Sequence, residues 1–188
     1  MQATARRRSV VSATSCARRR LIRSVRQNPR IPVMGHCVTA IISSNPAVGS
    51  ILRSSPSFVA VPLVDGLSLI PLDDDALDSV AADYSKATDG FTYLSPSLAA
   101  FLADHSRHAA LVYFETEYFG GDGTQAAVAY RDGHPLSTTP SSGDGAINRA
   151  LGCLGITPHG AFDEFDYVGL SRYRHTSDWI EAATPQTS

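Results

Sequence analysis

The clearest pattern of hydrophobic and polar positions lies in the middle of the chain. Residues 111–119 (LVYFETEYF) suit a strand, a glycine-rich stretch follows, and residues 124–130 (TQAAVAY) form a second strand-like run. Two such runs around a glycine turn are typical of a β-hairpin. Side chains alternate along a strand, so the pattern predicts two sets, Leu111, Tyr113, Glu115 and Glu117 on one face and Val112, Phe114, Thr116 and Tyr118 on the other.

Shorter patterns predict the other elements. An apolar run at residues 37–42 indicates a buried strand, and two runs around Asp65-Gly66 indicate a second hairpin. Helical spacing and start signals predict helices within residues 45–53, 73–84, 95–108, 145–156 and 175–183. The expected N-cap residues are Asn45, Ser95 and Thr176.

The order of these elements is neither a regular alternation of strand and helix nor a repeat. It predicts an α+β fold, a single domain with a mostly antiparallel sheet and helices packed on one face. We expect this domain to span residues 34–183, with a disordered arginine-rich head at 1–33 and a disordered tail at 184–188.

The head has an unusual composition. Residues 1–33 contain nine arginines and no acidic residue. Three interpretations stay open: a misassigned start with translation beginning at Met34, an organelle-targeting segment, or a basic arm that binds nucleic acid.

The remainder of the chain is acidic. It holds seven basic against 18 acidic side chains, so its own field repels nucleic acid and favours a basic protein partner. No run of 18 apolar residues exists, so we expect no membrane association. Three scattered cysteines suit a reducing compartment, which predicts a cytoplasmic protein unless the head is a transit peptide.

The two glutamates of the hairpin are the first candidate site. Glu115 and Glu117 share a face at a spacing that suits paired-carboxylate chemistry, so a small hydrolase is one hypothesis. The alternative is that both face water beside a recognition groove, since no nucleophile or oxyanion-binding helix start accompanies them. The candidate binding residues here are Tyr113, Glu115, Glu117, Tyr118, Gly120, Gly121 and Gln125.

A second candidate lies near the C-terminus, where residues 163–179 are rich in charge but keep large apolar side chains. We expect this segment to be partly extended. It is interpreted either as an internal lattice of ion pairs or as a binding rim, and its single tryptophan suits a core or a binding hot spot. The candidate residues are Asp163, Glu164, Arg172, Arg174, His175 and Trp179.

No motif indicates a cofactor or a metal. The glycine loop precedes a strand rather than a helix, which argues against phosphate binding. The histidines and cysteines do not form a zinc-ligand set, and Cys153 lies on an apolar helix face, typical of core.

Four segments carry a resemblance: MGHCVTAII, LVYFETEYFGGDGTQAAVAYRDG, INRALGCLGI and DEFDYVGLSRYRHTSDW. Over residues 34–181 the chain resembles a group of small uncharacterised bacterial proteins, mostly from GC-rich genomes. In size and style these are similar to immunity or accessory proteins, and the resemblance implies no catalytic residue.

These observations favour an acidic cytosolic domain that binds a protein, of the immunity or accessory type. The alternatives are a small hydrolase that uses Glu115 and Glu117, and nucleic-acid binding through the head.

Overall fold

The computed structural model describes residues 35–81, 83–119, 122–136 and 141–184. The arginine-rich head, with the expected start at Met34, lies outside the described residues. So do Gly120 and Gly121 of the hairpin loop.

A seven-stranded sheet forms the centre of the domain, with the order β2-β3-β1-β4-β5-β6 and with β7 paired to β5. Every pair of neighbouring strands is antiparallel, which confirms the α+β class and the antiparallel sheet. The strands are β1 (Gly35–Ser44), β2 (Val61–Pro62), β3 (Leu67–Pro71), β4 (Leu111–Phe119), β5 (Asp122–Arg131), β6 (His134–Pro135) and β7 (Ser141–Ser142).

Six α-helices and three short 3-10 turns surround this sheet. The helices are α1 (Asn45–Ser54), α2 (Asp74–Val80), α3 (Pro96–His105), α4 (Ala146–Cys153), α5 (Glu164–Tyr167) and α6 (Thr176–Ala183). The 3-10 turns are η2 (Val64–Gly66), η3 (Tyr84–Lys86) and η4 (Leu170–Arg172). No helix in the described ranges is both long and apolar enough to cross a bilayer.

The helix starts follow the sequence signals in part. Ser95 caps α3 as expected, because its side chain accepts a hydrogen bond from the backbone N–H of Leu98. Helix α1 begins one residue earlier than expected, with Ser44 as its N-cap, and α6 has His175 as its N-cap. The segment before α6 was expected to be partly extended, but α5 and η4 make it largely helical.

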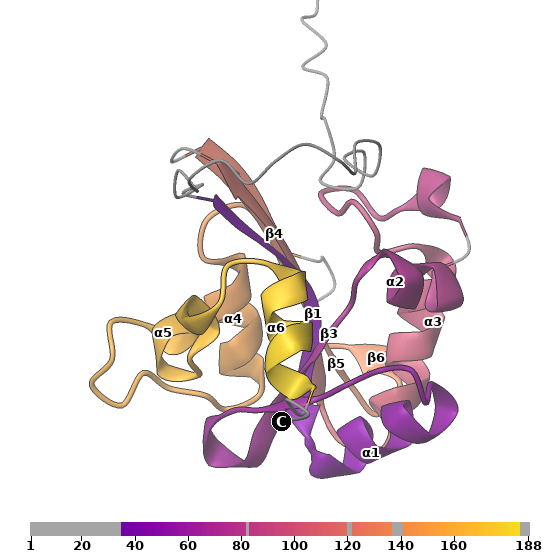
Figure 1. Ribbon diagram of the computed structural model, residues 1–188, viewed down its shortest axis with the longest axis horizontal. Coiled ribbons are helices and arrows are strands. Elements are labelled where there is room, and N and C mark those ends of the chain that lie inside the picture. The colour runs from indigo at the N-terminus through magenta and orange to yellow at the C-terminus, as the bar shows by residue number, and fades with distance from the viewer. Residues whose placement is uncertain (1–34, 82, 120–121, 137–140, 185–188) are drawn as a thin grey trace, which may run out of the picture. The chain divides into compact units, whose positions relative to one another are not determined.

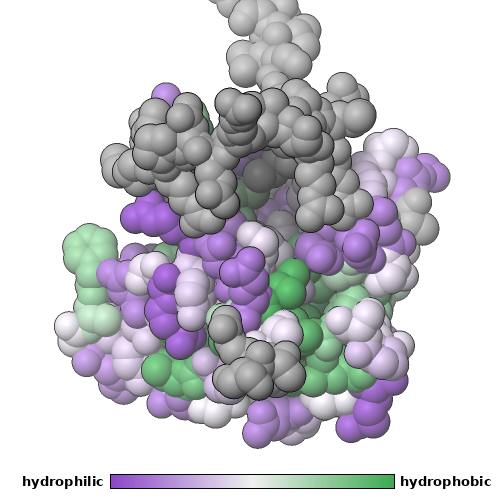
Figure 2. All heavy atoms as spheres, viewed as in Figure 1, coloured by the Kyte–Doolittle hydropathy of each residue, from purple (hydrophilic) through white to green (hydrophobic). Residues whose placement is uncertain are grey.

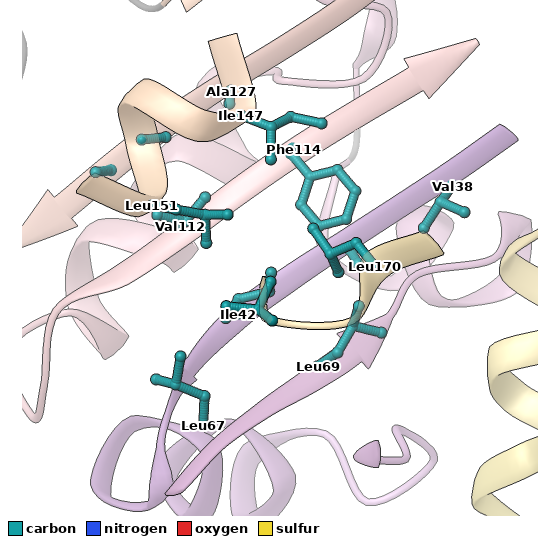
Figure 3. Close-up of a cluster of buried hydrophobic side chains, with 14 of the residues drawn as sticks. Val38, Ile42, Leu67, Leu69, Val112, Phe114, Ala127, Ile147, Leu151 and Leu170 are labelled. Carbon is teal, nitrogen blue, oxygen red and sulfur yellow. The ribbon is translucent and has the colours of Figure 1, made fainter. Parts of the chain in front are cut away.

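Helices cover both faces of the sheet, where the sequence predicted only one. In Figure 1, α4, α5 and α6 lie on one side of β1 and β4, and α1, α2 and α3 lie on the other. Each side has its own hydrophobic core. Figure 3 shows the first core, where Ile147 and Leu151 of α4 meet Val112 and Phe114 of β4.

The second core contains the opposite face of the same strand. Leu111 and Tyr113 of β4 are buried there with Leu98 and Leu102 of α3. Consecutive residues of β4 therefore enter different cores, which confirms the predicted alternation.

The first half of β1 is held by the C-terminal segment. Strand β3 pairs only with residues 40–44 of β1. Beyond that point the backbone N–H of Cys37 donates to the carbonyl oxygen of Arg174 at 2.7 Å, and the N–H of Thr39 donates to Oγ1 of Thr176 at 3.1 Å. These bonds satisfy part of the strand edge and fix the position of His36.

The β4–β5 hairpin is confirmed, with a register from Leu111 opposite Tyr130 to Phe119 opposite Asp122. A positive φ was expected at one of its three glycines. Gly123, the one within the described residues, is not at positive φ, and it serves a close approach instead. A Cβ there would lie 2.5 Å from Cα of Tyr118 and would collide with the carbonyl oxygen of Glu117.

This close approach leads to a stability prediction. We expect Gly123→Ala to lower the free energy of unfolding by about 1–3 kcal/mol, because the hairpin backbone must move apart to admit the methyl group. Urea unfolding of the purified chain measures this change.

A matched control is available in α4. A Cβ at Gly152 meets nothing within 4 Å, so Gly152→Ala should be neutral or stabilise by up to about 1 kcal/mol through helix propensity. Equal effects of the two substitutions would contradict the packing role of Gly123.

Candidate functional site

A pocket of about 360 Å³ opens between the sheet and the first turns of α4 and α5. Its volume lies within the range of small-ligand sites. The strands β1, β4 and β5 form one wall, and the two helices form the other. The lining residues are His36, Thr116, Tyr118, Gln125, Gly145, Ile147, Asn148, Asp163 and Phe165.

His36 and Thr116 form the sheet side of the pocket. Nδ1 of His36 lies 2.8 Å from Oγ1 of Thr116, which also accepts a hydrogen bond from the backbone N–H of Val38 at 3.0 Å. Nε2 of His36 lies 3.5 Å from the carbonyl oxygen of Leu170. The Thr116 hydroxyl also donates to the carbonyl oxygen of Val38 at 3.3 Å, so it connects the imidazole of His36 to the backbone of β1.

The imidazole of His36 is held in its neutral form. Burial lowers its pKa below the ordinary value of 6.5, and the nearby positive charges of Arg174 and His175 lower it further. The hydrogen bond to Leu170 opposes this shift without reversing it. His36 is therefore uncharged near pH 7 and contributes a ring and a hydrogen-bonding edge to the pocket.

Gln125 connects the sheet to the start of α4. Its Oε1 accepts a hydrogen bond from the N–H of Ile147 at 3.2 Å, and its Nε2 donates to the hydroxyl of Tyr118 at 3.0 Å. The N-cap of α4 is Gly145, which has no side chain to make a cap. Gln125, which lies on the neighbouring strand β5, therefore caps α4 in place of a side chain at the N-cap position.

Asn148 and Asp163 form the helical side. Nδ2 of Asn148 donates to Oδ2 of Asp163 at 2.9 Å, and Oδ1 of Asn148 accepts from the N–H of Phe165 at 3.0 Å. The other oxygen of Asp163 accepts from the N–H of Asp166 at 2.8 Å and caps α5. The ring of Phe165 meets that of His36 edge to face at 5.5 Å.

Three of the residues predicted from the sequence meet in this pocket, namely Tyr118, Gln125 and Asp163. His36, Thr116, Asn148 and Phe165 were not predicted. The sequence offers one partial signal for them, because Thr116 was expected on the same face as Tyr118. The contacts of His36 span 80 and 134 residues and those of Asn148 span 15 and 17, so they leave no local pattern.

Tyr113 and Glu115 lie away from the pocket, on the other face of β4. The expectation that both glutamates face water is wrong for Glu115, which is 8% exposed. Glu117 is exposed near the hairpin tip. The expected groove of Tyr113, both glutamates and Gln125 therefore does not form, because Gln125 faces the opposite side of the sheet.

Glu115 is a buried carboxylate with a full set of donors. It accepts hydrogen bonds from the backbone N–H groups of Thr92 at 2.6 Å and Tyr93 at 2.9 Å, and from the hydroxyl of Tyr113 at 2.7 Å. Burial raises its pKa above the ordinary value of 4.5, although these hydrogen bonds act in the opposite direction. Glu115 thereby fastens the loop before α3 to the sheet.

The C-terminal segment also proves mainly structural. Among the described residues the ion pairs are Lys86–Asp83 and Arg107–Asp104, so no ion-pair lattice forms between residues 163 and 175. Arg172 instead donates to the carbonyl oxygens of Gly169 and Pro62.

Trp179 belongs to the core. Its side chain is fully buried, with the guanidinium carbon of Arg172 5.2 Å from the ring centre and the ring of Tyr173 at 4.9 Å. Its indole N–H has no hydrogen-bond partner in the part of the chain that the structure describes. Of the two interpretations of this tryptophan, the structure supports a core residue.

The other candidates of this segment occupy different positions. Arg174 and His175 support the edge of β1 through the backbone. Glu164 is half-buried in the first turn of α5, next to Asp163. Within the described ranges, no group of three or more His, Cys, Asp or Glu residues is placed to hold a metal ion.

Comparisons with protein-family models, with curated proteins and with solved structures gave no match. The arguments about function therefore rest on the geometry of the pocket and its surroundings.

The role of Glu115 predicts a large difference between the two glutamates. Glu115→Ala should lower the free energy of unfolding by at least about 2 kcal/mol, because it leaves two backbone N–H groups and a tyrosine hydroxyl without an acceptor. Glu117→Ala on the same strand should change it by less than about 0.5 kcal/mol. Urea unfolding of both variants provides the comparison, and similar losses would disprove the fastening role.

Glu115 also predicts a pH dependence of stability. Because its pKa is raised in the folded chain, the folded state binds the proton more tightly than the unfolded state. Its contribution is therefore fully present below the unfolded value of 4.5 and is lost as the pH rises through the folded pKa.

The test compares wild type with Glu115→Gln, which cannot titrate. The unfolding free energy of wild type relative to this variant should fall as the pH rises from the unfolded value of 4.5 through the raised pKa of the folded chain. A difference that stays constant or grows with pH would show that the hydrogen bonds outweigh burial.

Proposed function

We propose that this domain is an acidic binding protein of the immunity or accessory type, and that it recognises a partner protein through the face that carries the pocket. The observation that carries the proposal is the pocket itself. It is open and lined by both polar and apolar side chains, and its polar groups position one another through hydrogen bonds across five separate elements. Such pre-organisation reduces the entropy lost on binding.

An exposed aromatic side chain beside the pocket supports a protein partner. Phe162 precedes the pocket residue Asp163 and is 91% exposed. Figure 2 shows hydrophobic surface at the left edge of the molecule beside the α5 segment, next to largely hydrophilic surface. Exposed aromatics next to polar groups are typical of the centres of protein interfaces.

Charge supports the same proposal. The chain after the head carries 18 acidic and seven basic side chains. Four acids lie at or beside the pocket, namely Asp144, Asp163, Glu164 and Asp166. A partner with a basic surface would be steered toward this face, and the rate of association would fall with added salt.

The hydrolase hypothesis receives less support from the same geometry. Glu115 already accepts three hydrogen bonds under the loop before α3, whereas Glu117 is exposed near the hairpin tip. The two carboxylates therefore lack a common site at which to share a substrate. Nucleic-acid binding through the head concerns residues outside the described ranges.

The experiment is affinity capture by the full chain from lysate of its native host, followed by measurement of binding to the captured partner. Phe162→Ser should weaken binding at least about fivefold, as expected for an aromatic contact in an interface. Leu136→Ser is the control, since this side chain is 40% exposed and lies away from α5.

The outcomes are distinct. A partner whose affinity falls with Phe162→Ser and with added salt supports the proposal. Equal affinity of both variants for a stoichiometric partner would place recognition on another face, and a chemical turnover by the purified chain alone would favour an enzyme.

A further inference from the structure

The hydrogen-bonding groups of the pocket define what kind of ligand group it can accept. Three protons of the pocket are not used in hydrogen bonds among the described residues. The hydroxyl of Tyr118 accepts a bond from Gln125, so its own proton is free to donate. The amide nitrogens of Gln125 and Asn148 each use one of their two protons, since each donates one hydrogen bond within the described residues.

The acceptors of the pocket are fewer. The amide oxygens of Gln125 and Asn148 each already accept a backbone N–H. Each carboxylate oxygen of Asp163 accepts one hydrogen bond and keeps a lone pair for another. Among the described residues Asp163 takes part in no ion pair, so no basic side chain of this part of the chain offsets its negative charge.

This combination of three donors and one carboxylate excludes charged ligand groups. A carboxylate or phosphate would satisfy the donors but would meet the negative charge of Asp163. An ammonium or guanidinium group would satisfy Asp163. Its own N–H donors would however face the O–H donor of Tyr118 and the N–H donors of Gln125 and Asn148. Either arrangement leaves half-buried polar groups repelled or unpaired, which is unfavourable.

An uncharged carboxamide matches both kinds of group. Its oxygen accepts two hydrogen bonds, and its nitrogen donates two. The rings of His36 and Phe165, packed edge to face, add a flat apolar wall beside these polar groups. His36 is neutral and adds no charge that would disfavour a neutral group.

We propose that the pocket binds an uncharged carboxamide, with its oxygen toward the donors of Tyr118 and Gln125 and its N–H toward Asp163. The inference rests on the proposed function and names the group recognised there, an asparagine or glutamine side chain of the partner protein. A free small-molecule amide carries the same chemistry, and the experiment separates the two sources.

The test is an NMR titration of the ¹⁵N-labelled full chain, in which the chemical shifts of the backbone amides in the pocket report binding. The probes are N-acetylglutamine methylamide, its glutamate and arginine counterparts, and benzamide as a free aromatic amide. We expect the glutamine probe to give saturable shifts at Gln125, Ile147 and Asn148. The glutamate and arginine probes should bind at least about tenfold more weakly, which corresponds to about 1.4 kcal/mol.

Tyr118→Phe is the variant that tests the geometry, because it removes one donor and keeps the ring. It should weaken binding of the glutamine probe about fivefold. Tyr84→Phe is the matched control, since it removes a hydroxyl that donates to Asp78 at an exposed site outside the pocket. It should leave binding unchanged, and both variants should retain the dispersed spectrum of the folded chain.

Several results would overturn the inference: tighter binding of the glutamate or arginine probe, shifts that do not saturate, or no effect of Tyr118→Phe. Binding of benzamide without the glutamine probe would support the amide chemistry and overturn the side-chain source. If the amide probes fail while capture still depends on Phe162, the carboxamide inference is wrong and the proposed function stands. If both fail, both are wrong.

Discussion

The antiparallel pairing of β1 with β4 is the interaction on which the rest of the structure depends. Its register places His36 opposite Tyr118 and Val38 opposite Thr116. Directly opposite residues share a face, so this register brings His36, Thr116 and Tyr118 to one side of the sheet. A shift of one residue would exchange the two faces of a strand and would remove both the pocket and one core.

The two faces of β4 then acquire different chemistry from neighbouring residues. Glu115 enters the face covered by α3 and the loop before it, where backbone N–H groups and a tyrosine hydroxyl surround it. Thr116 enters the opposite face, where it supports a neutral histidine at the pocket wall. Both residues are buried, so the partners on each face decide their roles: the glutamate holds a loop to the sheet and the threonine contacts the pocket histidine.

The pocket, the acidic surface and the exposed Phe162 together describe a surface suited to recognition. The polar groups of the pocket are satisfied largely by one another, which holds them in place without a ligand. This is the arrangement expected where specificity depends on the position of donors and acceptors. In the proposed function, the charge of the domain would contribute to the rate of encounter and the pocket to the choice of partner.

The sequence by itself determined most of the elements of this fold, with the exception of α5 and η4, and the faces of its central hairpin. Alternation along residues 111–119 separated Tyr113 and Glu115 from Thr116 and Tyr118, and Ser95 marked the start of α3, because these are local properties of the backbone. Only the tertiary structure decided which elements cover each face. The burial of Glu115 depends on a loop 22 or 23 residues away in the sequence. The pocket brings His36 together with residues 80 or more positions later. No local sequence pattern contains either set of contacts.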